Sequence, residues 1–117
     1  MTDKTAVLAF DLGASSGRAL IGELSLAEDG RRLLQVTEIH RFPNHAIQVG
    51  RHLHWDILRL FYEIKKSIRK AFQEGYAPQT FGIDSWGVDF GLLDRNGELI
   101  GNPYHYRDPQ TDGLIEE

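Results

Sequence analysis

The sequence lacks cysteine altogether, so it forms no disulfide bond and offers no thiolate ligand to a metal. It also lacks an apolar run close to the about 20 residues that span a bilayer, and its first residues do not resemble a signal peptide. A net charge of −4 argues against a nucleic-acid-binding surface. These absences predict a cytoplasmic protein with neither nucleic acid nor a membrane as partner.

The composition is that of an ordinary globular domain. Apolar residues make up 41% and charged residues 26% of the 117 residues, which distinguishes the chain from disordered sequences. This length suits one domain with a substantial hydrophobic core.

Three strands joined by turns are expected in the first part of the chain. Apolar residues 7–10 form the first strand, and a second apolar run follows Arg18. Residues 32–42 form the third strand, after a turn at Glu28-Asp29-Gly30. Because turns join them in succession, the three strands predict an antiparallel meander.

An amphipathic helix is expected after the meander. Asp56 is suited to cap its first turn, and Gly75 is suited to end it. Its apolar residues recur at spacings of three and four and build one face: Ile57, Leu60, Phe61, Ile64, Ile68, Ala71 and Phe72. Its charged residues build a face that we expect to be solvated: Arg59, Glu63, Lys65, Lys66, Arg69 and Lys70.

The segments on either side of this helix complete an α/β fold with a mixed sheet. Residues 80–84 follow the helix, so we expect them to join the sheet as a parallel strand. Residues 85–93 continue extended to a hairpin turn at Asn96-Gly97. Residues 44–54 are expected to form a polar loop whose histidines are solvated, because no carboxylate or thiol lies at a metal-ligand spacing: His45, His52 and His54.

A loop of small and hydroxyl residues interrupts the first hairpin: residues 11–18 read Asp-Leu-Gly-Ala-Ser-Ser-Gly-Arg. Gly13 and Gly17 are expected to adopt backbone angles closed to other residues, so that several N–H groups converge on one anion. The hydroxyls of Ser15 and Ser16 add neutral donors. The pattern favours a phosphate-binding loop.

Two charged residues flank this loop. Arg18 offers a forked, charged donor to a phosphate. Asp11 would repel a phosphate directly, so we expect it to face a hydrated Mg²⁺ that lies between the carboxylate and the phosphate.

The spacing of the loop excludes two other phosphate-binding motifs. It has no Gly-Lys-Ser/Thr ending, and its glycines do not follow the Gly-x-Gly-x-x-Gly pattern. A hairpin turn that binds no ligand is the alternative, and spacing alone does not decide between the two.

A second stretch has the ingredients of a sugar site. Trp86 beside Gly87 offers an aromatic face, and Asp84 and Asp89 lie nearby as acceptors for hydroxyl groups. The alternative is that Trp86 belongs to the core and that the aspartates lie in turns or face solvent.

Two stretches together resemble the leading motifs of the rhamnulokinases, a group within the FGGY carbohydrate kinases of the actin and hexokinase superfamily. Residues 11–18 carry the first motif, and residues 82–90, Gly-Ile-Asp-Ser-Trp-Gly-Val-Asp-Phe, carry the second. Shorter matches extend the resemblance over nearly the whole chain: His40-Arg41-Phe42, Trp55-Asp56, Tyr106-Arg107-Asp108, Thr111 and Gly113.

The resemblance implies a ribonuclease-H-like sheet, with residues 1–117 forming the N-terminal, incomplete portion of the first domain of a two-domain kinase. It implies transfer of the γ-phosphoryl group of ATP, with Mg²⁺, to the 1-hydroxyl of L-rhamnulose in L-rhamnose catabolism. In this family the aspartate that accepts the sugar's proton is expected beyond Glu117. We therefore expect no catalytic residue in this chain, and no activity from the chain alone.

The resemblance also assigns roles residue by residue. Asp11 matches the acidic residue that faces the metal-nucleotide, and Gly87 matches a sugar-contacting position, with Trp86 and Asp89 as neighbouring candidates. The expected ATP-phosphate-binding residues are Gly13, Ala14, Ser15, Ser16, Gly17 and Arg18.

Two other functions remain open. One is an FGGY kinase for another ketose or polyol, and the other is a non-catalytic nucleotide or sugar sensor on the same fold. The expected partners are a small sugar and ATP. We also expect self-association through sheet surfaces that further strands and helices would cover.

Overall fold

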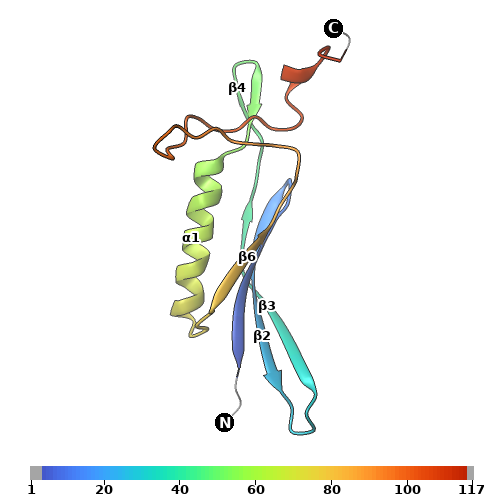
Figure 1. Ribbon diagram of the computed structural model, residues 1–117, viewed down its shortest axis with the longest axis vertical. Helices are drawn as coiled ribbons and strands as arrows, with labels where there is room; N and C mark the ends of the chain where they lie inside the picture. Colours follow the sequence, from blue (N-terminus) through green and yellow to red (C-terminus); the bar gives the residue numbers. More distant parts are fainter. Residues whose placement is uncertain (1–3, 116–117) are drawn as a thin grey trace.

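The computed structural model describes residues 4–115. Its main sheet has four strands in the order β3-β2-β1-β6, and one long helix lies against one face of it (Figure 1). Three antiparallel strands form the predicted meander: β1 (Thr5–Leu12), β2 (Ser16–Leu26) and β3 (Arg32–Pro43). After helix α1 (Ile57–Gln73), strand β6 (Thr80–Asp84) pairs with β1 in parallel. The predicted α/β fold with a mixed sheet is confirmed.

Helix α1 begins and ends where the sequence predicts. The Asp56 side chain accepts a hydrogen bond from the Arg59 N–H, and Gly75 follows the helix with a φ of 90°. Most of its predicted apolar face covers the sheet, but Phe61 and Phe72 lie away from the core and are 59% and 56% exposed. The core has one cluster formed by Leu8, Phe10, Ala19, Ile21, Ile39 and Ala71, and a second formed by Leu12, Phe42 and Leu60.

One charged residue of α1 does not lie on the solvated face. Glu63 is 2% exposed, and its Oε2 lies 2.6 Å from Nε2 of His40 on β3. Its other oxygen, Oε1, lies 2.9 Å from an Arg59 nitrogen. Burial raises the pKa of the Glu63 carboxyl, but the hydrogen bonds and charges of His40 and Arg59 outweigh it and leave the pKa below its usual value. The expectation of solvent exposure was wrong for Glu63, because His40 supplies a partner across the helix-sheet interface.

Residues 44–54 are more ordered than the expected polar loop. Strands β4 (Ile47–Val49) and β5 (His52–His54) form a small hairpin, with Gly50 at a φ of 61°. The C-terminal part of the chain holds this hairpin: the His105 N–H donates to the Leu53 carbonyl at 2.9 Å. A segment about 50 residues away in sequence thus orders what looks like a loop.

The chain after β6 is mostly irregular. The predicted turn at Asn96-Gly97 is present, with Gly97 at a φ of 80°, but the flanking residues form a single isolated bridge between Leu93 and Leu99 rather than two strands. A short 3-10 helix, η1 (Pro109–Thr111), follows. The sequence of residues 114–117 is compatible with the start of a helix; Leu114 and Ile115 form a turn, and residues 116 and 117 lie outside the described residues. Within residues 4–115, no helix combines the length and the apolar character needed to cross a bilayer.

Candidate functional site at the carboxyl ends of two parallel strands

The parallel pairing of β1 and β6 brings the two sequence motifs to the same end of the sheet, where both strands have their carboxyl ends. Asp11 on β1 is in register with Asp84 on β6, and adjacent strands lie about 4.8 Å apart. The loop after β1 and the segment that begins at Ser85 both leave the sheet from this end (Figure 1). The carboxyl ends of parallel strands are a common place for ligand sites in α/β folds.

Two of the predicted site residues bind each other. Asp11 and Arg18 are opposite in the β1-β2 pairing, and an Arg18 guanidinium nitrogen donates a hydrogen bond to the Asp11 carboxylate. This hydrogen bond and the charge of Asp11 raise the pKa of Arg18 above its usual value. Both side chains remain 40% exposed, so a ligand can reach the pair.

Asn44 holds the loop between β1 and β2 in its shape. Its side-chain amide donates to the Gly13 carbonyl at 2.7 Å, and its backbone N–H donates to the Ser15 carbonyl at 3.0 Å. In a trans peptide unit the C=O of one residue and the N–H of the next point in opposite directions. Since the carbonyls of Gly13 and Ser15 face Asn44, the N–H groups of Ala14 and Ser16 point away from it. The exposed tip at Ala14 and Ser15 is therefore open to an anion.

The two loop glycines are explained by close contacts rather than by unusual backbone angles. Neither Gly13 nor Gly17 has a positive φ, contrary to expectation. A Cβ on Gly17 would lie 2.3 Å from the Phe42 ring, and one on Gly13 would lie 3.1 Å from the Ser16 carbonyl oxygen. Gly17 therefore makes room for an aromatic ring of the core.

Trp86 and Asp89 both contact Trp55, a residue whose place in the site the sequence does not reveal. The rings of Trp86 and Trp55 stack with centroids 3.9 Å apart, and the Trp55 indole N–H donates a hydrogen bond to the Asp89 carboxylate. Trp86 also packs against the core cluster of Leu12, Phe42 and Leu60. Trp86 thus has a core role. It packs beside Leu12, the last residue of β1, which directly precedes the phosphate-loop candidate.

Gly87 lies next to this stack and has open space around it: a Cβ placed there would meet no atom within 4 Å. Asp89 lies on the wall of a cavity of about 540 Å³, together with Tyr104 and Tyr106. Ligand sites commonly have volumes of this order and a few polar groups in an apolar lining. The structure therefore places Asp89 where a small molecule could be held.

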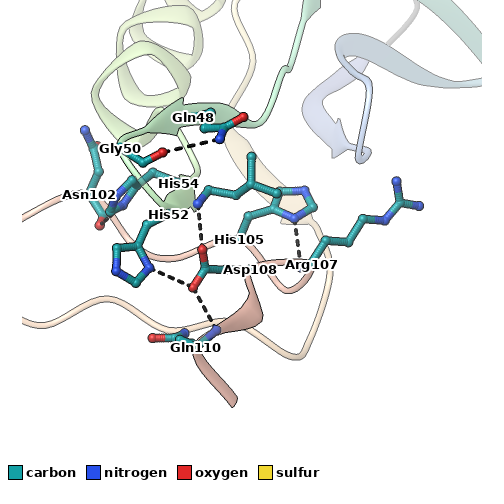
Figure 2. Close-up of polar contacts among 10 residues, drawn as sticks. Gln48, Gly50, His52, His54, Asn102, His105, Arg107, Asp108 and Gln110 are labelled. Carbon is teal, nitrogen blue, oxygen red and sulfur yellow. Dashed lines mark hydrogen bonds and ion pairs between the residues drawn. The ribbon is translucent and has the colours of Figure 1, made fainter. Parts of the chain in front are cut away.

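The same cavity is also lined by a buried aspartate, Asp108, whose structural role the sequence does not reveal. Asp108 accepts hydrogen bonds from the Leu53 N–H at 2.7 Å and the Gln110 N–H at 3.1 Å, and lies 3.1 Å from Nδ1 of His52 (Figure 2). Burial raises the pKa of Asp108, but these hydrogen bonds outweigh it and leave the pKa below its usual value. Asp108 thus holds the β4-β5 hairpin to the C-terminal segment.

The donor set suits a metal that arrives with a nucleotide better than a resident metal. Across residues 4–115 there is no group of three or more metal-binding side chains. Mg²⁺ commonly binds through one or two carboxylates, substrate phosphates and water. Asp11, with the phosphate-loop candidate beside it, fits that pattern.

Comparison with known proteins agrees with the motifs. The chain is 46% identical over 110 residues to a rhamnulokinase from Oceanobacillus iheyensis and 46% identical over 113 residues to one from Bacteroides thetaiotaomicron, covering 94% and 97% of this chain and 22% of each relative. A gluconate kinase from Lactobacillus acidophilus has a similar fold, with a TM-score of 0.73 at 13% identity, over 97% of this chain and 22% of that one. No protein-family model matches the chain.

The fold is the ribonuclease-H-like fold of the carbohydrate kinases. Over 94% of its length the chain is similar to rhamnulokinases, as its two motifs predict. It spans about a fifth of the length of the curated relatives it matches.

Proposed function

We propose that residues 1–117 form the first portion of the first domain of a sugar kinase that transfers the γ-phosphoryl group of ATP to the 1-hydroxyl of L-rhamnulose. The observation that carries this proposal is the parallel β1-β6 pair. It brings the Asp11–Arg18 loop and the Trp86–Asp89 segment to the same end of the sheet. A kinase needs its nucleotide and sugar side by side, because phosphoryl transfer depends mainly on positioning and charge neutralisation.

The nucleotide side of the site would use the loop between β1 and β2. Asp11 would bind Mg²⁺, and Arg18 would bind a phosphate, so binding of Mg²⁺-ATP would exchange the Asp11–Arg18 ion pair for one contact to each. The remaining donors would come from Gly13, Ala14, Ser15, Ser16 and Gly17. ATP supplies the transferred phosphoryl group.

The sugar side would use the segment after β6. Gly87 would let a sugar approach the backbone, since nothing occupies the space beside its Cα. Trp86 would offer the edge of its ring, which stacks on Trp55. Asp89 would accept a hydrogen bond from a sugar hydroxyl. The reaction would belong to L-rhamnose catabolism in the cytoplasm.

We expect the 117-residue chain alone to show no turnover. Phosphoryl transfer requires donors on both sides of the reacting phosphate and an acceptor for the sugar's proton. The chain covers 22% of its curated relatives, and its site offers one side of such a cleft.

A chimera tests the proposal. The matching 110 residues of the Oceanobacillus iheyensis rhamnulokinase are replaced by this chain, and ADP release is measured with L-rhamnulose and Mg²⁺-ATP. We expect turnover, and we expect its loss in the Asp11→Asn chimera, which removes the charge that binds Mg²⁺. A folded chimera that binds ATP but releases no ADP would overturn the kinase proposal and favour a sensor.

A further inference from the structure

Three charged side chains form a row across the main sheet, beside the phosphate-loop candidate. Arg18 on β2 is opposite Asp11 on β1 and, on its other side, opposite Arg41 on β3. Residues that are directly opposite in antiparallel strands have their side chains on the same face, with Cβ atoms about 4.5 to 5.5 Å apart. The row lies on the face away from α1, because the neighbouring residues Leu12 and Phe42 pack against the helix.

A bulge in β3 brings a fourth charged side chain to the same face. Glu38 precedes Arg41 by three residues, a spacing that in a regular strand places two side chains on opposite faces. The register of β3 shifts against β2 between Ala19 and Leu20, so that Glu38 is opposite Leu20. The Arg41 Nε donates a hydrogen bond to the Glu38 carboxylate at 2.7 Å. Bulges beside functional sites commonly re-aim a side chain in this way.

The two arginines are neighbours, although each has a carboxylate as its partner. Like charges that are directly opposite destabilise a sheet, and here Asp11 pairs with Arg18 while Glu38 pairs with Arg41. The charge of Glu38 also contributes to the raised pKa of Arg18, so it acts on both guanidinium groups. A guanidinium has five N–H donors, more than one carboxylate can engage. With side chains 40% and 57% exposed, Arg18 and Arg41 can therefore both donate to an anion.

We propose that Arg41 is a second phosphate-binding residue, which holds the polyphosphate of a nucleoside triphosphate together with Arg18. This inference rests on the function proposed above, in which Mg²⁺ binds Asp11 and Arg18 turns to a phosphate. Arg18 then lies beside Arg41 without its own carboxylate, and a polyphosphate that contacts both removes the repulsion between them. The forked donors of a guanidinium match the oxygens of a phosphate.

The position of the row relative to the loop suits a polyphosphate. Ser16, one of the loop residues with an N–H open to an anion, is opposite Pro43, two residues from Arg41. This separation is about 7 Å along the strand. On the other side, Asp84 on β6 is in register with Asp11, so carboxylates lie on β6 and β1 and guanidinium groups on β2 and β3. The row thus favours Mg²⁺ at one end and phosphate groups at the other.

The rhamnulokinase chimera tests the role of Arg41 through its affinity for Mg²⁺-ATP, measured by calorimetry. Arg41→Gln is expected to raise the Kd at least about tenfold and to make the Kd less dependent on salt, because one charged contact to phosphate is lost. Arg32→Gln is the matched control, since it removes the same charge at the exposed far end of β3. It should change neither the Kd nor its salt dependence.

Glu38→Gln separates phosphate binding from a purely structural ion pair. It frees Arg41 from its carboxylate, so the Kd should stay the same or fall. If the Arg41–Glu38 pair served only to stabilise β3, Glu38→Gln and Arg41→Gln would weaken binding alike, and that result would overturn the inference.

The inference and the proposed function can fail separately. An unchanged Kd in Arg41→Gln would overturn the role of Arg41 even in a chimera that turns over L-rhamnulose, whereas an original chimera without turnover would count against the kinase. Should Arg41→Gln fail to fold, Arg41→Lys replaces it, because lysine keeps the charge but loses the fork. We expect a raised Kd for this variant too, and a Kd equal to that of the original chimera would overturn the inference.

Discussion

The ring of Phe42 lies directly against the backbone of Gly17, so that a Cβ on Gly17 would be 2.3 Å from its nearest atoms. Phe42 is 3% exposed and belongs to the cluster with Leu12 and Leu60, so it has little freedom to move. The end of the phosphate-loop candidate is thus fixed to the core by a contact that only glycine permits.

Gly17→Ala is expected to destabilise the protein by about 1 to 3 kcal/mol, because the ring must shift or adopt a strained rotamer. The measurement is the free energy of unfolding in urea. Gly87→Ala is the matched control, with no atom within 4 Å of the added methyl group, and should be nearly neutral. Equal stabilities of the two variants would contradict the close packing at Gly17.

Asn44→Ala is expected to loosen the loop that precedes Gly17. It removes the donor to the Gly13 carbonyl from a residue that is 3% exposed, and losing such a buried hydrogen bond costs about 1 to 3 kcal/mol. In the chimera we expect a weaker affinity for Mg²⁺-ATP, measured as a smaller rise in melting temperature. His45→Ala, at the exposed neighbouring position, should leave that rise unchanged. An undiminished rise with Asn44→Ala would show that the loop binds nucleotide without this tether.

Acid is expected to weaken the contact between α1 and β3. The folded pKa of Glu63 lies below its unfolded value, so its contribution to stability is present above the unfolded value of about 4.3 and is lost as the pH falls through the folded pKa. Unfolding free energies measured from pH 7 to pH 3 should therefore decline for the original chain. In Glu63→Gln, which cannot titrate, stability at pH 7 should be lower and its decline with acid smaller. Parallel pH profiles of the two proteins would exclude Glu63 as a source of the acid sensitivity.

Trp55→Phe is expected to disturb the sugar side while keeping an aromatic ring against Trp86. It removes the indole donor to Asp89, and we expect a loss of about 1 kcal/mol in stability. In the chimera the KM for the sugar should rise more than the KM for ATP, because Asp89 loses the group that orients it. If only the KM for ATP rises, Asp89 lies outside the sugar site.

The sequence predicts those elements whose signals are local. The cap at Asp56, the stop at Gly75 and the spacing of apolar residues define α1, and the Asn96-Gly97 turn is present. The missed features depend on partners far along the chain: Asn44 reaches Gly13 across 31 positions, and Glu63 reaches His40 across 23. No periodicity or turn pattern contains such a pairing.

The same distinction applies to the candidate site: its local motifs can be predicted from the sequence, and its long-range contacts cannot. The Asp11–Arg18 loop is visible as a motif, and the order of strand, helix and strand implies the parallel β1-β6 pair that brings the second motif beside it. The stack of Trp86 on Trp55 is not visible, since Trp55 stands beside the helix cap with no pattern that links it to Trp86. Their association comes from the packing of the C-terminal segment against the hairpin and the helix.

The choice of sugar tests the account most directly. The chimera is offered L-rhamnulose, L-fuculose, D-xylulose and glycerol in turn with Mg²⁺-ATP, and kcat/KM is determined for each from ADP release. The account predicts a clear preference for L-rhamnulose, which Gly87→Ala reduces by narrowing the space beside the backbone. A preference for another ketose or for glycerol would contradict the assignment to L-rhamnulose and identify the chain as part of a different FGGY kinase.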